Sequence, residues 1–221
     1  MPKDIEEQPT EDPVFEAEHG GARGRTVPPS GTPEAGGSGG ENPGPALPPL
    51  AIVVSRYNDA ITGNMLRAAV EEYHARGGRD DNLSIIDAFG AFELTPLAEA
   101  CARSGLCAGV LCLGCVIKGE TDHDAYIAHA VAQGLANIAV RHGVPCSFGV
   151  LTVNTVEQAV HRAGGRDGTE PGNKGAEAMA ALIETVRAQA AIQEAVRTGT
   201  PRCRYRIEGA EDPTPPPIPT P

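Results

Sequence analysis

Four apolar runs of strand length divide this chain, and each is followed by a polar turn and a segment with helical periodicity. Continuous apolar runs of this length are typical of parallel strands that are covered on both faces. Strands that alternate with helices in this way favour an α/β domain. We therefore predict a three-layer, flavodoxin-like sandwich in which a four-stranded parallel sheet lies between helices. The predicted strands are residues 50–55, 83–88, 108–113 and 146–152.

The segments between and after these runs predict five helices, at residues 60–76, 93–104, 124–142, 155–161 and 173–196. In the third of them, Ile127, Val131, Leu135 and Ile138 recur at helical spacing and share one face. Parallel strands end at the same edge of a sheet. The polar segments after the first three strands are therefore expected to meet at that edge and to form a ligand site.

The two ends of the chain differ from this domain in composition. The first fifty residues hold ten of the chain's twenty prolines, nine glycines and few aromatic or β-branched side chains. Such a segment buries too little apolar surface to offset the entropy of ordering it. We predict a disordered, acidic Pro/Gly-rich tail at residues 1–49, one domain at 50–198 and a Pro-rich tail at 199–221.

The net charge of −11 is concentrated outside the domain, because residues 1–49 hold nine acidic and three basic side chains. The domain has no basic footprint, which argues against nucleic acid as a partner. The N-terminus lacks the pattern of a signal peptide, and no apolar run is long enough to span a membrane. We expect a cytoplasmic protein without a membrane partner.

Six cysteines raise the question of a metal or redox site. Only Cys112 and Cys115 have CxxC spacing. In an extended strand, a separation of three places two side chains on opposite faces. We therefore expect reduced thiols, mostly buried, and no metal site.

The polar turn after the third apolar run has the features of an anion site. It carries Lys118, Thr121 and His123 just before a predicted helix, where backbone N–H groups and the helix dipole favour negative charge. The same residues also fit a solvated loop in which Thr121 or Asp122 caps the helix. Taken alone, the turn leaves both interpretations open. Neither a P-loop nor a GxGxxG motif follows any predicted strand, so nucleotide binding through those motifs is not indicated.

Six short motifs, taken in order along the chain, resemble those of the 6,7-dimethyl-8-ribityllumazine synthase family over roughly residues 50–187. The motifs are Arg56-Tyr57-Asn58, Gly90-Ala91-Phe92-Glu93, Val116-Ile117-Lys118-Gly119-Glu120-Thr121-Asp122-His123, Phe148-Gly149, Arg162-Ala163-Gly164 and Gly172-Asn173-Lys174-Gly175. The resemblance implies an enzyme of riboflavin biosynthesis that condenses 5-amino-6-(D-ribitylamino)uracil with 3,4-dihydroxy-2-butanone 4-phosphate. It implies release of phosphate and water, with no cofactor or metal.

By match to the family's motifs, fourteen residues are expected to form the site. The resemblance implies that Tyr57 stacks on the pyrimidine and that His123 transfers protons, a task suited to an imidazole near neutral pH. It implies that Phe148 closes the pocket from a neighbouring subunit. The residues expected to bind the ribitylaminouracil are Tyr57, Asn58, Ala91, Phe92, Glu93, Cys115, Val116, Ile117 and Phe148. Those expected to bind the butanone phosphate are Glu120, Thr121, Arg162 and Lys174.

The chain departs from the family's pattern at four positions. Tyr57 stands where Phe or Trp is usual, Phe89 where Pro is common, and Cys115 where Thr is frequent. Glu120 places a carboxylate at the phosphate turn, so the turn must bind phosphate through its backbone N–H groups.

The expected assembly is a homopentamer. The loop over residues 165–174 is longer than in shell-forming members, in which pentamers meet at this loop. A shell of about sixty subunits is the alternative state that the resemblance allows. Riboflavin synthase is a further partner that it suggests. The competing function is a lumazine- or flavin-binding scaffold or shell protein that has lost catalysis. An unrelated flavodoxin-like binding module is the third.

Overall fold

The computed structural model describes residues 47–200, 203 and 205–207. Its core is one parallel sheet of four strands in the order β2-β1-β3-β4. The strands are β1 (Leu50–Ser55), β2 (Leu83–Ala88), β3 (Gly109–Ile117) and β4 (Cys146–Val153). The predicted α/β fold is confirmed. The predicted tail at residues 1–49 falls outside the described residues except for 47–49. Only residues 199, 200, 203 and 205–207 of the predicted C-terminal tail are described.

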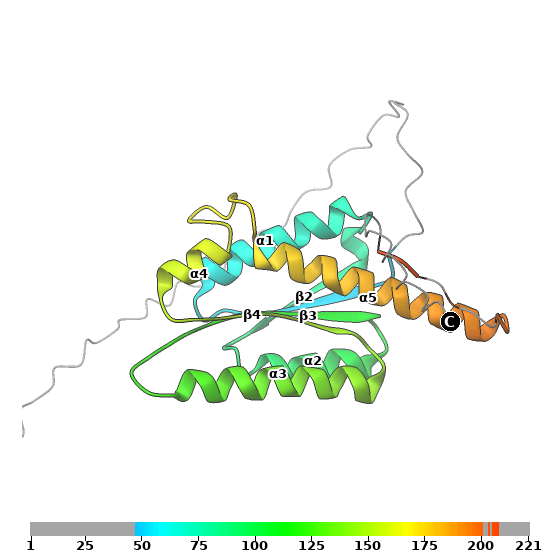
Figure 1. The fold of residues 1–221 in the computed structure, drawn as a ribbon, viewed down its shortest axis with the longest axis horizontal. Coiled ribbons are helices and arrows are strands. Elements are labelled where there is room, and N and C mark those ends of the chain that lie inside the picture. Colours follow the sequence, from blue (N-terminus) through cyan, green and yellow to red (C-terminus); the bar gives the residue numbers. More distant parts are fainter. Residues whose placement is uncertain (1–46, 201–202, 204, 208–221) are drawn as a thin grey trace, which may run out of the picture. The chain divides into compact units, whose positions relative to one another are not determined.

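Five α-helices cover the two faces of the sheet (Figure 1). Helices α2 (Leu94–Ser104) and α3 (His123–His142) lie on one face. Helices α1 (Asp59–Ala75), α4 (Val156–Arg162) and α5 (Lys174–Arg197) lie on the other. A short 3₁₀ turn, Asp80–Asn82, leads into β2. Within the described residues, no helix is long and apolar enough to cross a membrane.

The sheet separates two hydrophobic cores. Leu111, Leu113 and Cys115 of β3 pack into the core under α1, α4 and α5, whereas Val110 and Cys112 pack into the core under α2 and α3. Alternate residues of a buried strand thus face opposite helical layers, which explains why neither β1 nor β3 alternates between apolar and polar residues. Cys112 and Cys115 face opposite layers, as their spacing predicts. Among the described residues, no group of three His, Cys, Asp or Glu side chains is placed to hold a metal ion.

The third strand is longer than the sequence predicts. We expected it at residues 108–113, but β3 continues to Ile117 because Gly114–Ile117 pair with Val150–Val153 of β4. Gly114 interrupts the apolar run, and pairing with a strand more than thirty residues away compensates for it. The turn before α3 therefore spans only residues 118–122, and Cys115, Val116 and Ile117 are strand residues.

Helix α5 approaches α1 closely at its first turn. A Cβ on Gly175 would lie 2.1 Å from the carbonyl oxygen of Met65, so only glycine permits this approach. Asn173 caps the helix by accepting a hydrogen bond from the Gly175 N–H at 2.8 Å. These contacts fix where Lys174 emerges from the fold.

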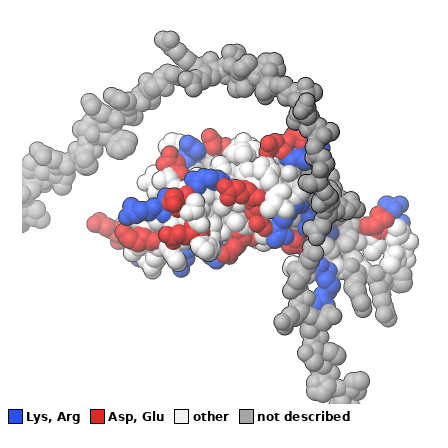
Figure 2. Space-filling view, turned by 90° about the horizontal axis from the view of Figure 1, so that it is seen from above, with Lys and Arg blue, Asp and Glu red and all other residues white. Residues whose placement is uncertain are grey.

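The face of the molecule formed by α1, α4 and α5 carries charges of both signs. Figure 2 shows acidic and basic side chains interspersed on the visible part of this face, without a continuous basic area.

Candidate active site

A pocket of about 1440 Å³ opens at the carboxyl ends of β1, β2 and β3. The segments that follow these three strands meet there, with the first half of α3 as the remaining wall. We call it the main pocket. It is lined by Tyr57, Asn58, Phe89, Gly90, Ala91, Phe92, Glu93, Cys115, Val116, Ile117, Lys118, Gly119, Thr121, His123, Asp124, Ala125, Tyr126, Ile127, His129, Ala130 and Gln133.

The turn after β1 is tied to both neighbouring strands. Asn58 has φ 62° and ψ 43°, a left-handed conformation that asparagine tolerates better than most residues. Its side-chain Nδ2 donates a hydrogen bond to the Cys115 carbonyl at 3.1 Å. The Tyr57 N–H donates to the Phe89 carbonyl at 3.0 Å. Together these bonds hold the Tyr57 ring at the pocket mouth.

Four exposed aromatic rings line this pocket: Tyr126 of α3 is 75% exposed, and the other three belong to the turns after β1 and β2. Tyr57 is 66% exposed, Phe92 is 59% exposed and Phe89 is 83% exposed. Exposed aromatic rings that gather at a pocket indicate a surface for a planar or apolar ligand. Glu93 is the last residue of the turn after β2. A Cβ on Gly90 would lie 2.9 Å from the Glu93 Oε2, so the Glu93 carboxylate lies against the backbone of Gly90.

The edge of β3 supplies backbone groups at the floor of the pocket. Burial raises the pKa of the Cys115 thiol to about 11, so at neutral pH it is a neutral group and a poor nucleophile. Residues 115–117 can therefore offer a ligand their main-chain groups and apolar side chains, but no charge.

The turn between β3 and α3 presents hydrogen-bond donors to the pocket. Helix α3 begins at His123, and Asp122 occupies the N-cap position without a side-chain cap bond. The Thr121 Oγ1 lies 3.5 Å from the His123 N–H, which is longer than a normal hydrogen bond. Neither Thr121 nor Asp122 therefore makes a good side-chain cap for α3. The first backbone N–H groups of the helix can donate hydrogen bonds to a ligand. Both Thr121 and His123 line the pocket, and His123 is exposed.

A second, smaller hollow of about 430 Å³ lies along the edge strand β4, beside α4 and α5. Phe148 is 44% exposed there, and Arg162 and Lys174 line the same hollow. The Lys174 Nζ contacts both oxygens of Glu177, at 2.8 and 2.6 Å. Among the described residues, Arg162 Nη1 donates to the Gln158 carbonyl alone, at 3.3 Å. We call this site the edge hollow.

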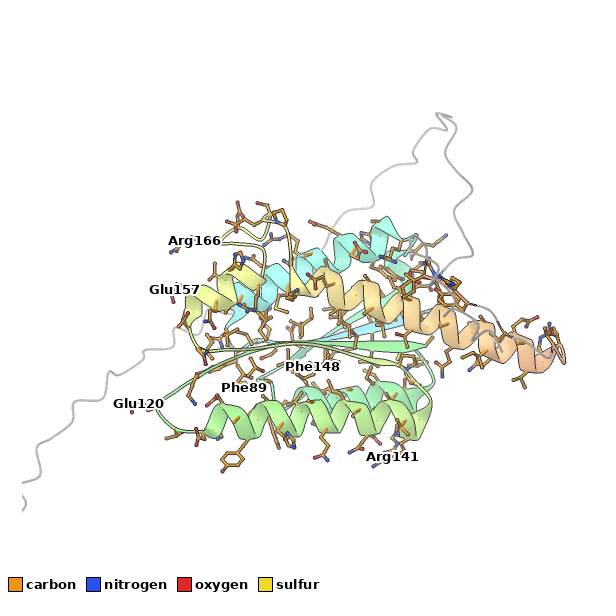
Figure 3. All side chains as sticks on the ribbon, viewed as in Figure 1. Phe89, Glu120, Arg141, Phe148, Glu157 and Arg166 are labelled. Atoms are coloured by element: carbon orange, nitrogen blue, oxygen red, sulfur yellow. The ribbon has the colours of Figure 1, made fainter. Side chains whose placement is uncertain are left out.

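Within one chain, the predicted site residues therefore fall into two groups. Ten of them line the main pocket: Tyr57, Asn58, Ala91, Phe92, Glu93, Cys115, Val116, Ile117, Thr121 and His123. Phe148, Arg162 and Lys174 line the edge hollow. Glu120 lines neither, and Figure 3 shows it at the outer end of the turn between β3 and α3.

Several pocket residues were not expected from the sequence. Tyr126, Ala130 and Gln133 follow His123 at three, seven and ten residues, a helical spacing that places them on the pocket side of α3. That spacing is visible in the sequence. Lys118, which the sequence indicated only as a cation of a possible anion site, also lines the pocket, and so does Asp124, which was not assigned to the site.

Comparison with known proteins identifies the family of this chain. Residues 48–190 match the family model of 6,7-dimethyl-8-ribityllumazine synthase. Proteins of that name are similar to this chain. The one from a Sulfurovum species is 40% identical over 145 residues, which cover 66% of this chain and 90% of the relative. The one from Deinococcus deserti is 44% identical over 137 residues, which cover 62% and 85%. The chain belongs to the 6,7-dimethyl-8-ribityllumazine synthase family.

Proposed function

We propose that this chain is a catalytically active 6,7-dimethyl-8-ribityllumazine synthase in riboflavin biosynthesis. It condenses 5-amino-6-(D-ribitylamino)uracil with 3,4-dihydroxy-2-butanone 4-phosphate and releases phosphate and water. The observation that carries the proposal is the main pocket, in which ten residues that match the family's motifs come together from three strand ends and α3.

The pyrimidine substrate fits the half of the pocket formed by β1, β2 and β3. Tyr57 offers an aromatic face for stacking on the ring, and residues 115–117 offer main-chain groups to its polar edge. The ribityl chain then lies toward Phe92 and Glu93, because an ionised carboxylate accepts hydrogen bonds from hydroxyl groups.

The reaction requires proton transfers and a site for a departing phosphate. The amine on C5 of the uracil attacks the ketone and loses water to form an imine. Elimination then breaks the C–O bond to phosphate, and the second amine closes the ring with loss of another water. His123, exposed in the pocket at the start of α3, is the group that accepts and returns these protons. The Thr121 turn and the N-terminus of α3 receive the phosphate through N–H donors.

The edge hollow completes the site of a neighbouring copy. Phe148, Arg162 and Lys174 line a hollow separate from the main pocket of their own chain. Since the family places the residue equivalent to Phe148 in the adjacent subunit's site, Arg162 and Lys174 reach that site with it. Arg162 is suited to the phosphate because a guanidinium binds it through two parallel hydrogen bonds.

A homopentamer is the assembly that we propose. The loop over residues 165–174 is held on α1, because the Asn64 Nδ2 donates to the Gly165 and Arg166 carbonyls at 3.3 and 3.2 Å. Arg67 Nη1 donates to the Asp167 carbonyl at 2.6 Å. A loop fixed in this way occupies a constant volume on the surface and hinders contact between pentamers there. Light scattering should give the mass of five subunits, and a particle of about sixty subunits would overturn this assignment.

The activity is tested by mixing purified protein with both substrates and following lumazine fluorescence. Arg162→Ala should lower the rate, whereas Arg166→Ala should not, because Arg166 is exposed on the neighbouring loop and lines neither hollow. A folded protein that binds the lumazine product without forming it would instead be the non-catalytic scaffold.

A further inference from the structure

Lys118 is the only arginine or lysine that lines the main pocket, as far as the described residues extend. The remaining lining residues that can carry positive charge are His123 and His129. A doubly charged anion in this pocket therefore has one permanent cation within the same chain. This residue stands at the end of β3, where its backbone N–H donates to the Val153 carbonyl at 2.8 Å and fixes its position.

The ammonium group of Lys118 lies between two carboxylates but is poorly satisfied by them. Its Nζ is 3.4 Å from the Asp122 Oδ1 and 3.9 Å from the Asp124 Oδ1. Charge-assisted hydrogen bonds are normally 2.7–2.9 Å long, and an ammonium group has three N–H donors. At least two of these donors are thus available to a ligand.

The carboxylate of Asp124 is a second, independent observation about the position of the Lys118 ammonium. Its side chain is 12% exposed, and its Oδ1 is the one buried side-chain polar atom without a hydrogen-bond partner among the described residues. A buried carboxylate is costly unless a positive charge compensates it, and Lys118 is the nearest such charge. Asp124 is therefore a positioning residue that keeps the Lys118 ammonium beside the Thr121 turn.

We propose that Lys118 binds the phosphate group of the phosphorylated substrate, as a same-chain counterpart to the arginine from the edge hollow. This inference rests on the proposed function and adds a residue to its phosphate site. The nearby carboxylates of Glu120 and Asp122 are exposed, so solvent screens their repulsion of the anion. The charge of Asp124 is directed at Lys118 itself.

The test compares Lys118→Met with Lys118→Arg in the assembled protein. We measure the dissociation constant of inorganic phosphate by calorimetry and the KM of each substrate by fluorescence. Loss of a charge-assisted contact should weaken phosphate binding and raise the KM of the butanone phosphate about tenfold in Lys118→Met. The KM of the ribitylaminouracil should change by less than about twofold, and Lys118→Arg should restore most of the loss.

Two further variants make the outcome specific. Asp122→Asn removes an exposed carboxylate beside the ammonium and should tighten phosphate binding. Arg141→Gln removes one positive charge at the far end of α3 (Figure 3) and should leave phosphate binding unchanged. Equal phosphate affinity in the wild type and Lys118→Met overturns the inference, whether or not the wild type turns over. If the wild-type protein binds phosphate but does not turn over, the proposed function is refuted. The comparison of phosphate affinity between the wild type and Lys118→Met still tests the inference about Lys118.

Discussion

At the scale of single residues, Asn58 connects the backbone of the β1 turn to the floor of the main pocket. It is the only residue other than glycine with positive φ in the described part of the chain, at 62°. Its side-chain Nδ2 also donates a hydrogen bond to the Cys115 carbonyl at 3.1 Å. The left-handed conformation turns the chain from β1 into α1 while leaving the Tyr57 ring at the pocket mouth.

Substitutions at Asn58 should separate the backbone effect from the hydrogen bond. Asn58→Gly loses the hydrogen bond but adopts positive φ without strain, whereas Asn58→Ala loses the hydrogen bond and tolerates the left-handed region less well than asparagine. We expect Asn58→Gly to lower the free energy of unfolding by about 1 kcal/mol and Asn58→Ala by about 2 kcal/mol. Urea denaturation at matched subunit concentration measures both, because the stability of an oligomer depends on concentration. Equal losses in the two variants would show that the backbone conformation contributes nothing.

His123 is the second residue whose role a single substitution can define. Much of the rate should come from holding two substrates together, so His123→Ala should retain measurable turnover. We expect kcat to fall by about 10²–10⁴-fold, the usual contribution of a general acid–base group, with little change in either KM. Steady-state lumazine formation gives these constants. A folded His123→Ala protein with no detectable turnover would contradict this division of labour.

At the scale of elements, the C-terminal segment is joined to α1 and α5 through one carboxylate. Tyr205 donates a hydrogen bond to the Glu184 Oε2 at 2.5 Å, and Arg76 Nη1 contacts the Glu184 Oε1 at 2.6 Å. Arg187 Nη1 lies 3.3 Å from the same oxygen. Glu184 is 13% exposed, so the cluster is well screened from water. It attaches Tyr205 to helices that the sequence alone does not connect with it.

The pKa of Tyr205 gives a measurable sign of this attachment. Desolvation, followed by the hydrogen bond to Glu184, raises the pKa from 10.0 to about 12. Since the folded-state pKa is raised, the attachment stabilises the fold at neutral pH and is lost as pH rises from about 10 through about 12. In a spectroscopic phenol titration, the change that Tyr205→Phe removes should therefore occur near pH 12. A midpoint for that change at the ordinary value of 10.0 would show that Tyr205 is free in solution.

The elements that could be predicted from the sequence are those that local periodicity specifies. The four strands and five helices of the described residues were all expected, and every boundary except the end of β3 agrees within one residue. The end of β3 was missed because Gly114 breaks the apolar run and the pairing with β4 is non-local. The Asn58–Cys115 bond joins residues 57 apart, and the Tyr205 attachment depends on tertiary packing. No local sequence pattern predicts the Asn58–Cys115 hydrogen bond or the Tyr205 attachment.

The residues of the candidate site likewise include some that the sequence predicts and some that depend on tertiary packing. Motif matching predicted ten residues of the main pocket, because they follow strand ends in the chain. It did not predict that Arg162 and Lys174 lie in a different hollow from Thr121, since that depends on how α4 and α5 pack beside β4. Lys118 lies inside a matched motif and was noted as a cation of a possible anion site, but it was assigned to neither substrate, because only its distances to Asp122 and Asp124 distinguish it.

At the scale of the whole molecule, we propose that one chain carries two incomplete halves of a site. The main pocket holds His123 and the Thr121 turn, and the edge hollow holds Arg162 and Phe148. None of the residues that the structure describes lines both hollows. If each site combines a main pocket from one copy with an edge hollow from the next, a substitution in the main pocket and one in the edge hollow can be placed on different chains of one oligomer.

Mixing two variants of low activity tests this arrangement directly. In an oligomer assembled from equal amounts of His123→Ala and Arg162→Ala chains, some sites pair an Arg162→Ala main pocket with a His123→Ala edge hollow. Such a site has both His123 and Arg162. Random assembly makes about one quarter of the sites intact in this sense, so activity should rise to about that share of the wild-type rate.

The control is a mixture made without exchange of subunits. Combining the two variants after separate assembly should give only the mean of their two low rates. Dissociating and reassembling them together should then raise the activity. A reassembled mixture that stays at the mean would show that His123 and Arg162 act from the same chain, which requires α4 to move toward α3 within one subunit.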